Sequence, residues 1–370
     1  MGEFDLIARY FKHPALGPEV ALGVGDDCAL LNHTPGMQWA VSSDMLVAGR
    51  HFFEDVDPAA LGHKALAVNL SDLAACGARP VAFTLALSLP QADEAWLRAF
   101  SEGLMNLAQE HACSLVGGDT TRGPLNICIT VMGEVPHGQA LLRSGARPGD
   151  EVYVSGHLGD ARLALEALQT IQALQALEVH RAPDAMPQTA TSLATRATTP
   201  VNPRVHAWPE SVLAAARQRL ERPTPRVALG LALRGVASAA MDLSDGLAGD
   251  LTHLLQASAV GATLNIDDAL ELIASKHHPA MPSGQFDNIF SRDDQIRLVV
   301  SGGDDYELLF TAPPQARARV EAAALASGTS VHCIGRIDAL PGLRWVDRHG
   351  QAVLVKAASY DHFAAQHGPA

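Results

Sequence analysis

Aspartates recur along this chain beside glycines or directly after apolar runs, and this pattern constrains the fold more than any other feature. They occur as Asp26-Asp27 after Gly-Val-Gly, Asp44 after Ser42-Ser43, Asp72 in NLSD, Asp119 in GGDTT, Asp242 and Asp245 in MDLSDG, and Asp304-Asp305 in SGGDDYE. We expect them at turns that follow strands, because α/β folds bind ligands at strand ends. Two carboxylates ~4 Å apart repel by roughly 4 kcal/mol at an effective dielectric of about 20, so a converging set needs cations. Magnesium is the predicted cation, because it takes oxygen ligands and bridges substrate phosphates.

Each aspartate taken singly has a simpler interpretation as a turn former or a helix cap. We keep that interpretation for Asp26 and Asp305. For the set as a whole the metal site is favoured, because Gly25, Gly118 and Gly303 beside its members let backbone N–H groups approach phosphate oxygens.

The spacing of apolar residues predicts strands that alternate with helices, and hence an α/β chain. Predicted strands cover residues 38–43, 82–89, 126–132, 151–156, 237–243, 262–266, 297–301, 306–311 and 331–335. A predicted helix begins at Pro58, capped by Asp57, and ends before Gly77. Further predicted helices cover residues 92–111, 224–234, 247–257 and 315–327.

The length of 370 residues favours two domains of similar size. Residues 136–150 are rich in Gly, Pro and Arg, which predicts a connection between a domain of residues 1–147 and a domain of residues 148–370. Residues 170–222 are dominated by Ala, Gln, Thr and Pro, which predicts a surface insertion, partly helical around 211–220 and partly disordered.

The formal net charge of −13 disfavours nucleic acid and anionic membranes as partners, because both are polyanionic. The N-terminal segment MGEFDLIARYF is not a signal peptide, and no apolar run approaches the ~20 residues that cross a bilayer. The five cysteines are odd in number and never spaced as CxxC, as is typical of a reducing compartment. We therefore expect a cytoplasmic protein.

Two phosphate-binding patterns are missing from the sequence. It contains no GxxxxGK(S/T) loop and no protein-kinase signature set, and none of its four lysines follows a glycine turn. Arg143 in LLRSG is compatible both with a phosphate clamp and with an ordinary surface arginine.

Eight motifs in order resemble the thiamine-monophosphate kinase family of the aminoimidazole ribonucleotide synthetase-like superfamily. They are GVGDDCALL, SSDMLVAGRHF, KALAVNLSDLAACGARP, GGDTTRG, RSGARPGD, MDLSDGLAGDL, SGGDDYELLF and SYDHF, and the resemblance runs from Gly2 to Phe363 outside residues 170–222. It implies an α/β (α+β) fold of two domains: an N-terminal sheet domain that dimerises and a C-terminal α/β domain. It also implies a homodimer, with ATP and several Mg²⁺ ions in a cleft between the domains.

The resemblance further implies roles for individual residues. The implied metal ligands are Asp27, Ser42, Ser43, Asp44, Asp72, Asp119, Asp242 and Asp245. The implied ATP-binding residues are Gly118, Asp119, Arg143 and Ser244, and the implied contacts to thiamine monophosphate are His51, Asp304 and Tyr360. Similar proteins often carry Glu where Asp304 stands. From the residues alone, a lone histidine such as His51 is usually structural, and the ring of Tyr360 could simply cover the core.

The implied reaction is direct, Mg²⁺-dependent transfer of the γ-phosphoryl group of ATP to thiamine monophosphate, which gives thiamine diphosphate and ADP. It needs no catalytic side chain, because the acceptor oxygen is already ionised at neutral pH. The alternatives are another ATP-dependent member of the superfamily (selenophosphate synthetase-like or aminoimidazole ribonucleotide synthetase-like), a non-catalytic protein that binds divalent metal, and a metal-dependent phosphatase.

Overall fold

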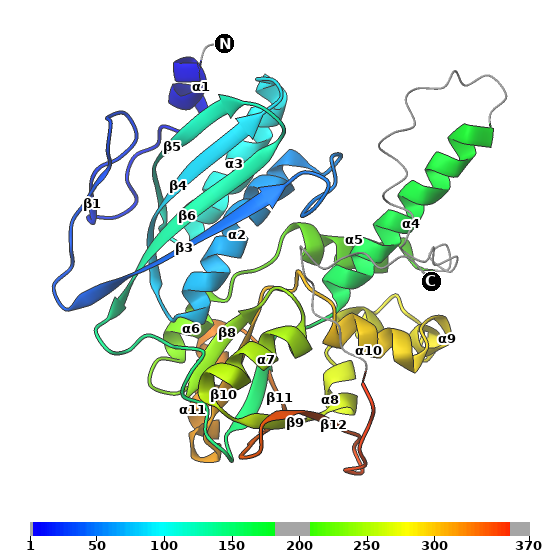
Figure 1. The fold of residues 1–370 in the computed structure, drawn as a ribbon. Coiled ribbons are helices and arrows are strands. Elements are labelled where there is room, and N and C mark those ends of the chain that lie inside the picture. Colours follow the sequence, from blue (N-terminus) through cyan, green and yellow to red (C-terminus); the bar gives the residue numbers. More distant parts are fainter. Residues whose placement is uncertain (1–2, 182–207, 356–370) are drawn as a thin grey trace.

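The computed structural model of this chain describes residues 3–181 and 208–355, and its described part contains two main sheets (Figure 1). The first sheet has the strand order β3-β6-β4-β5. Its strands are β3 (Met37–Val47), β6 (Asn126–Pro136), β4 (Arg79–Leu89) and β5 (Ser114–Arg122). The β3–β6 and β4–β6 pairs are antiparallel, whereas β4 and β5 run parallel. Helices α2 (Pro58–Ala75) and α3 (Glu94–Glu110) cover one face of this sheet (Figure 1).

The second sheet has six strands in the order β12-β9-β11-β7-β10-β8. They are β12 (Gly342–Val346), β9 (Gly261–Asn265), β11 (Val331–Asp338), β7 (Glu151–Ser155), β10 (Glu307–Ala312) and β8 (Ala239–Leu243). The helices of this half are α4 (Asp160–Arg181), α5 (Glu210–Glu221), α6 (Val227–Ala232), α7 (Leu247–Ser258), α8 (Ile266–Leu270), α9 (Gln285–Ile289), α10 (Arg292–Val300) and α11 (Arg317–Ser327). The 3₁₀ turns are η2 (Ala274–His277) and η3 (Pro314–Ala316).

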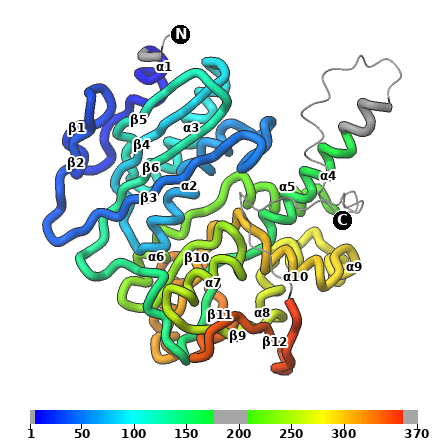
Figure 2. Tube along the Cα trace, viewed as in Figure 1, coloured from blue at the N-terminus to red at the C-terminus, as the bar shows by residue number. Residues whose placement is uncertain are grey.

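The N-terminal segment adds helix α1 (Glu3–Tyr10) and a short pair of strands, β1 (Val20–Leu22) and β2 (Leu30–Leu31). Figure 2 shows this pair beside the four-stranded sheet. Val20 and Leu31 pack there against Val81, Ala82 and Val116 of the sheet. None of the helices in residues 3–181 and 208–355 is long and apolar enough to cross a membrane.

Helix α2 lies between the two halves of the molecule and begins where the sequence predicts. The side chain of Asp57 accepts a hydrogen bond from the backbone N–H of Ala60, and Pro58 occupies the first turn. Most residues of α2 are buried, because the helix packs on the first sheet, on α3 and on α6. A Cβ at Gly230 of α6 would lie 2.0 Å from the carbonyl oxygen of Ala74, so only glycine allows this contact.

Most predicted elements of the regular fold are confirmed, but residues 297–301 are not a strand. They fall in the last turns of α10 and the residue after it. The helix begins at a capping box in which the Ser291 and Asp294 side chains each accept from the other's backbone N–H. Leu298, Val299 and Val300 are all buried, which explains why this apolar run resembled a strand.

The expectation that the aspartates lie at turns after strands is wrong for four of them, although the predicted helix and the predicted strand 237–243 already contained Asp72 and Asp242. Asp44 lies inside β3, Asp119 inside β5, Asp242 inside β8 and Asp72 in the last turns of α2. Strand β5 continues because it stays paired with β4 as far as Arg122, while Asp72 and Asp242 accept hydrogen bonds from Ser42 and Ser71.

The predicted surface insertion needs a partial correction. Helix α4 runs from Asp160 to Arg181 and so includes the first residues of the predicted insertion. The helix expected around 211–220 is confirmed as α5. Val212 and Ala216 of α5 are buried, so this helix belongs to the core of the second half. Residues 182–207 of the predicted insertion lie outside the described residues.

We expect Gly230→Ala to destabilise the protein, because the added methyl group overlaps the backbone of α2. The free energy of unfolding should fall by about 1–3 kcal/mol, as is usual for an overpacked core. Urea unfolding followed by circular dichroism measures this change. Gly23→Ala is the matched control, since a Cβ there meets only Val20 at an ordinary 3.8 Å; equal stability of the two variants would contradict the packing argument.

Candidate active site at the junction of the two sheets

Three aspartates from three different elements gather beside the C-terminal end of α2. Asp44 comes from β3, Asp72 from α2 and Asp242 from β8. The Ser42 hydroxyl donates to Asp72 Oδ2 at 2.5 Å, and the Ser71 hydroxyl donates to Asp242 Oδ2 at 2.9 Å. The second bond joins the two halves of the molecule, because Ser71 belongs to the N-terminal half and Asp242 to the second sheet.

The charges of these three carboxylates act on one another. Burial raises the pKa of Asp44 to about 6, and the charge of Asp72 raises it as well. Burial also raises the pKa of Asp242 to about 7, with a further contribution from Asp72. The pKa of Asp72 is raised by burial too, although the hydrogen bond from Ser42 and the charge of Arg143 lower it. Ionising all three groups together is therefore unfavourable, and a divalent cation among them would relieve that repulsion.

The residues present fit a magnesium ion in their chemistry. Every side chain in the group offers oxygen, which is the donor that Mg²⁺ prefers. Within the described part of the chain, no three His, Cys, Asp or Glu side chains already form a cluster that could hold a metal ion. Magnesium is usually held by one or two carboxylates together with waters and substrate phosphates, so a complete protein cage is not required.

Asp27 and Asp119, two other predicted ligands, are exposed. Asp119 lies on β5 opposite Ala86 of β4, and the backbone N–H of Asp27 donates to the Asp26 side chain. The contact of Asp26 agrees with its interpretation as a turn former. Among the contacts of the described residues, none joins Asp27 or Asp119 to the three buried carboxylates.

Ser43 is placed on the opposite face of β3 from Ser42 and Asp44, as the alternation of a strand requires. Its hydroxyl donates to the carbonyl oxygen of Ile129 at 3.1 Å and lies 3.0 Å from the Thr130 hydroxyl. The structure therefore does not bring the Ser43 side chain to the carboxylate group.

Edge strand β3 is held in position by side chains that bond its backbone. The N–H of Asp44 donates to Asn69 Oδ1 of α2 at 3.1 Å, and the N–H of Val47 donates to His51 Nδ1 at 3.0 Å. An edge strand needs such partners for its free backbone groups. One role of His51 is thus structural, as the simpler interpretation proposed.

The turn that contains Ser244 and Asp245 is organised by Asp250, which the sequence analysis missed. The Asp250 carboxylate accepts the backbone N–H groups of Ser244, Asp245 and Gly246 at 3.0–3.1 Å. Burial raises the pKa of Asp250 to about 6, while these hydrogen bonds lower it. The available signal was its position in the first turn of the helix that follows DLSDG, where acidic residues are favoured.

The SGGDDYE segment lies against that turn. The backbone N–H of Asp304 donates to the Ser244 carbonyl at 2.9 Å, and that of Tyr306 donates to the Leu243 carbonyl at 2.8 Å. Both residues adopt positive φ, +66° at Asp304 and +50° at Tyr306, which is uncommon for residues other than glycine. The pKa of Tyr306 is raised chiefly by burial. The charges of nearby aspartates, first Asp304 and then Asp44, raise it further. The segment is therefore close to the carboxylate group.

Lys64 of α2 connects two of the predicted substrate residues, and the sequence analysis missed it as well. Its ammonium nitrogen lies 2.8 Å from Asp304 Oδ1 and 3.4 Å from the carbonyl oxygen of His51. The lysine side chain is only 4% exposed. The sequence signal was its spacing from Asp72, because residues eight apart lie on one face of a helix. Tyr360, the third predicted substrate residue, lies outside the described residues.

Two predicted ATP-binding positions have distinct surroundings. Arg143 is exposed, and its positive charge lowers the pKa of Asp72, so it stands near the carboxylate group. Gly118 lies in β5 with φ of +144°, and a Cβ there would be 1.8 Å from the Leu85 carbonyl oxygen. Glycine is required at that position by the contact between β4 and β5, whatever its role toward a phosphate.

Asp305 and Glu307 have structural partners. The Asp305 carboxylate accepts the N–H of Gly159 just before α4, in agreement with its interpretation as a cap. Glu307 is buried and accepts hydrogen bonds from two guanidinium nitrogens of Arg226, both at 2.6 Å, and from the Ser155 hydroxyl at 2.6 Å.

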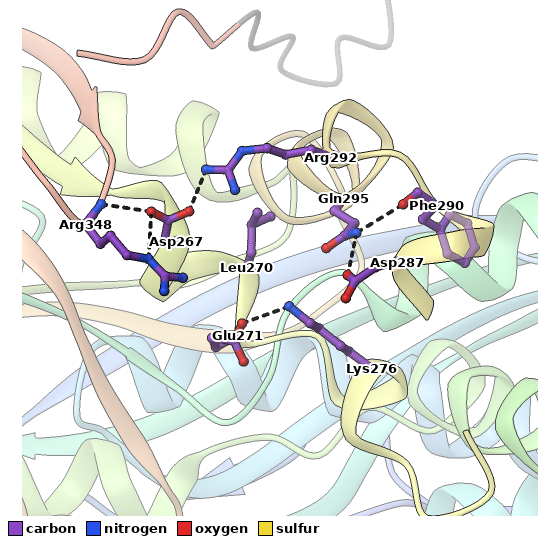
Figure 3. Close-up of a pocket in the computed structure, with 9 residues that line it drawn as sticks. All are labelled: Asp267, Leu270, Glu271, Lys276, Asp287, Phe290, Arg292, Gln295 and Arg348. Atoms are coloured by element: carbon purple, nitrogen blue, oxygen red, sulfur yellow. Dashed lines mark hydrogen bonds and ion pairs between the residues drawn. The ribbon is translucent and has the colours of Figure 1, made fainter. Parts of the chain in front are cut away.

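A separate pocket of about 390 Å³ lies in the second half, between α8, α9 and α10 (Figure 3). Its charged side chains are paired with one another. Arg292 and Arg348 both contact Asp267, and Lys276 contacts Glu271 at 2.8 Å (Figure 3). This mutual pairing leaves no excess charge to attract a charged ligand.

Comparisons with known proteins place the sequence in a family. The AIR synthase related protein family matches with its N-terminal domain over residues 25–135 and with its C-terminal domain over residues 147–347. Thiamine-monophosphate kinase of Salmonella typhimurium is 44% identical over 365 residues, which is 98% of this chain and 98% of that protein.

Solved structures show the same similarity. The crystal structure of thiamine-monophosphate kinase from Stenotrophomonas maltophilia K279a has a TM-score of 0.71 and 38% identity, and covers 95% of this chain and 96% of that chain. The structure of AaThiL complexed with AMPPCP and TMP has a TM-score of 0.63 and 24% identity, and covers 94% of each chain. This second likeness concerns the fold.

We expect Mg²⁺ to raise the melting temperature of the wild-type protein and to do so less in Asp242→Asn. In Mg²⁺-free buffer at pH 8 the variant should be the more stable protein, by on the order of 1 kcal/mol, because it removes one of three mutually repelling charges. Differential scanning calorimetry with and without Mg²⁺ measures both effects. Asp293→Asn, at an exposed position of α10, should respond like the wild type. Equal responses of all three proteins would rule out a metal at Asp242.

Proposed function

The chain belongs to the thiamine-monophosphate kinases of the AIR synthase related family, and we propose that the carboxylates at its sheet junction hold the Mg²⁺ ions of that reaction. It is a phosphotransferase of thiamine biosynthesis. It transfers the γ-phosphoryl group of ATP to thiamine monophosphate, which gives thiamine diphosphate and ADP. The superfamily alternatives are disfavoured by the full-length similarity to thiamine-monophosphate kinases.

One observation carries the proposal for the site. Asp44, Asp72 and Asp242 come from three elements and both halves of the chain, yet each acts electrostatically on the others. Bound Mg²⁺ would offset the negative charge of the two phosphate-bearing substrates and of the departing ADP. Asp27, Asp119, Asp245 and the Ser42 and Ser43 oxygens complete the proposed ligand set. For Ser43 the proposed ligand is the backbone oxygen, because its hydroxyl lies on the other face of β3.

The side chains of the protein then have to bind and orient two polyanions. Arg143 near Asp72 supplies a fixed positive charge for ATP, with Gly118, Asp119 and Ser244 as further proposed contacts. His51 and Asp304 are proposed for the thiamine monophosphate side, with Tyr360 from outside the described residues. The acceptor phosphate is already ionised, so positioning and charge compensation account for the chemistry without a general base.

We also propose the domain division 1–147 and 148–370, a homodimer and a cytoplasmic location. The division is supported by the two sheets and by the two matched family domains. The dimer is supported by the face of β3 that points away from α2, where Val41 is 62% exposed, Met45 53% and Trp39 36%. This face also carries the exposed Ser43, and three exposed large apolar side chains on one strand are typical of an interaction surface. The location is supported by five cysteines that form no disulfide and by the use of ATP.

We expect Asp72→Asn to lower the turnover number by more than about 100-fold, because the residue bonds Ser42 and acts on both other carboxylates. Mass spectrometry of thiamine diphosphate formed from ATP, Mg²⁺ and thiamine monophosphate measures the rate. Asp293→Asn should keep the wild-type rate. A rate near wild type for Asp72→Asn at saturating Mg²⁺ would defeat the assignment.

We expect Val41→Asp to convert a dimer into a monomer, because it places a charge in the middle of the exposed strand face. Analytical ultracentrifugation of wild type and variant measures the mass in solution. Leu354→Asp is the control, since Leu354 is 90% exposed outside this face. A wild-type monomer, or a Val41→Asp dimer of unchanged stability, would refute the proposed interface.

A further inference from the structure

Lys64 is a buried charge at the substrate side of the proposed active site. Its side chain is 4% exposed, and its ammonium group contacts Asp304 Oδ1 and the His51 carbonyl oxygen. Burial of an ammonium group is unfavourable unless the charge is paired and hydrogen-bonded. The two contacts of Lys64 offset the cost of burying its charge, and they fix the ammonium group between Asp304 and His51.

The position of Lys64 along α2 relates it to the metal side of the site. Lys64 and Asp72 are eight residues apart and share one face of the helix, at levels separated by ~12 Å. Both ends of this face bond the second half of the molecule, through Ser71 to Asp242 at 2.9 Å and through Lys64 to Asp304 at 2.8 Å. The helix thus sets the spacing between the carboxylate group and Asp304.

The ion pair also determines what Asp304 can do. Lys64 binds Oδ1, and the described part of the chain places no hydrogen-bond donor on Oδ2. A paired carboxylate has little net charge to recruit a further cation, so Asp304 does not join the metal-binding carboxylates. Its second oxygen can accept a hydrogen bond from a donor on the substrate. The Asp304 side chain is 29% exposed, compared with 4% for Lys64, so Asp304 is the more accessible member of the pair.

We propose that Lys64 is a positioning residue for the binding of thiamine monophosphate. Through its contacts with Asp304 and with the backbone of His51, Lys64 orients these two residues toward the heterocyclic part of the substrate. The inference rests on the proposed roles of His51 and Asp304 in the reaction. Lys64 acts through these two groups and not on the transferred phosphoryl group. It therefore affects recognition of thiamine monophosphate and leaves ATP binding to the other end of the α2 face.

Steady-state kinetics of Lys64→Met separates this role from a purely structural one. The KM for thiamine monophosphate should rise about tenfold or more, because a charge-assisted hydrogen bond that orients Asp304 is lost. The KM for ATP should stay at its wild-type value. Lys64→Arg keeps the charge and should recover part of the loss. The control is Lys276→Met, which removes a lysine of similar pairing in the separate pocket of Figure 3.

A double-mutant cycle tests whether Lys64 acts through Asp304. Lys64→Met and Asp304→Asn should each raise the KM for thiamine monophosphate, and the double variant should raise it by less than the product of the two effects. If Lys64→Met does not fold, Asp304→Asn breaks the same ion pair at its more exposed member. The affinity of this variant for thiamine monophosphate is then measured by calorimetry without ATP.

The outcomes are distinguishable. A Lys64→Met protein with a lower melting temperature and an unchanged KM for thiamine monophosphate would overturn the inference, as would an equal rise in the KM values of both substrates. An Asp304→Asn protein of wild-type affinity would overturn it too. Absence of thiamine diphosphate from wild type and Lys276→Met would instead refute the function itself.

Discussion

The burial of α2 between the two halves of the chain is the constraint on which the rest of the structure depends. A helix that is covered on several sides has to be apolar on most of its surface, and any polar side chain on it needs a partner. In α2 the exceptions are His63, which bonds the Pro223 carbonyl oxygen away from the carboxylate group, and four residues of the site: Lys64, Asn69, Ser71 and Asp72. Their partners are Asp304, the N–H of Asp44, Asp242 and Ser42. The contacts that satisfy the buried helix are therefore the contacts that build the site.

The same face of α2 carries two opposite electrostatic situations. At its C-terminal end, Asp72 faces Asp44 and Asp242. Burial raises the pKa of all three, and the charge of Asp72 raises the pKa of Asp44 and of Asp242 further. At its other end, Lys64 and Asp304 compensate each other. At the Asp72 end, cations held by the carboxylates can bind a substrate phosphate. At the Lys64 end, the fixed Asp304 carboxylate can accept hydrogen bonds from the polar groups of an organic cation. The arrangement thus suits a substrate that has a phosphate at one end and a heterocycle at the other.

Local signals predicted much of the fold, while the site depended on contacts that no local signal reveals. Asp57 and Pro58 marked the start of α2 correctly, because capping depends on neighbours in the sequence. The predicted strand 38–43 ended too early, because Asp44 was interpreted as a turn residue although β3 continues to Val47. Lys64 and Asp250 were missed for different reasons: the partner of Lys64 is 240 residues away, and Asp250 looked like an ordinary first-turn acid. Of the aspartates that the sequence singled out, Asp44, Asp72 and Asp242 act electrostatically on one another in the described part of the chain, and the metal-binding role of the whole set stays a prediction.

In the SGGDDYE segment, the buried charged residues Asp305 and Glu307 fix the backbone conformation of their neighbour Asp304. Positive φ at Asp304 and Tyr306 costs of order 1–3 kcal/mol each, so the conformation persists only if the surroundings impose it. The surroundings do so from three directions. Asp305 is bound by the N–H before α4, Glu307 by Arg226, and Asp304 by Lys64. Asp305 and Glu307 are held in the core directly after Asp304, so the backbone at Asp304 has little freedom.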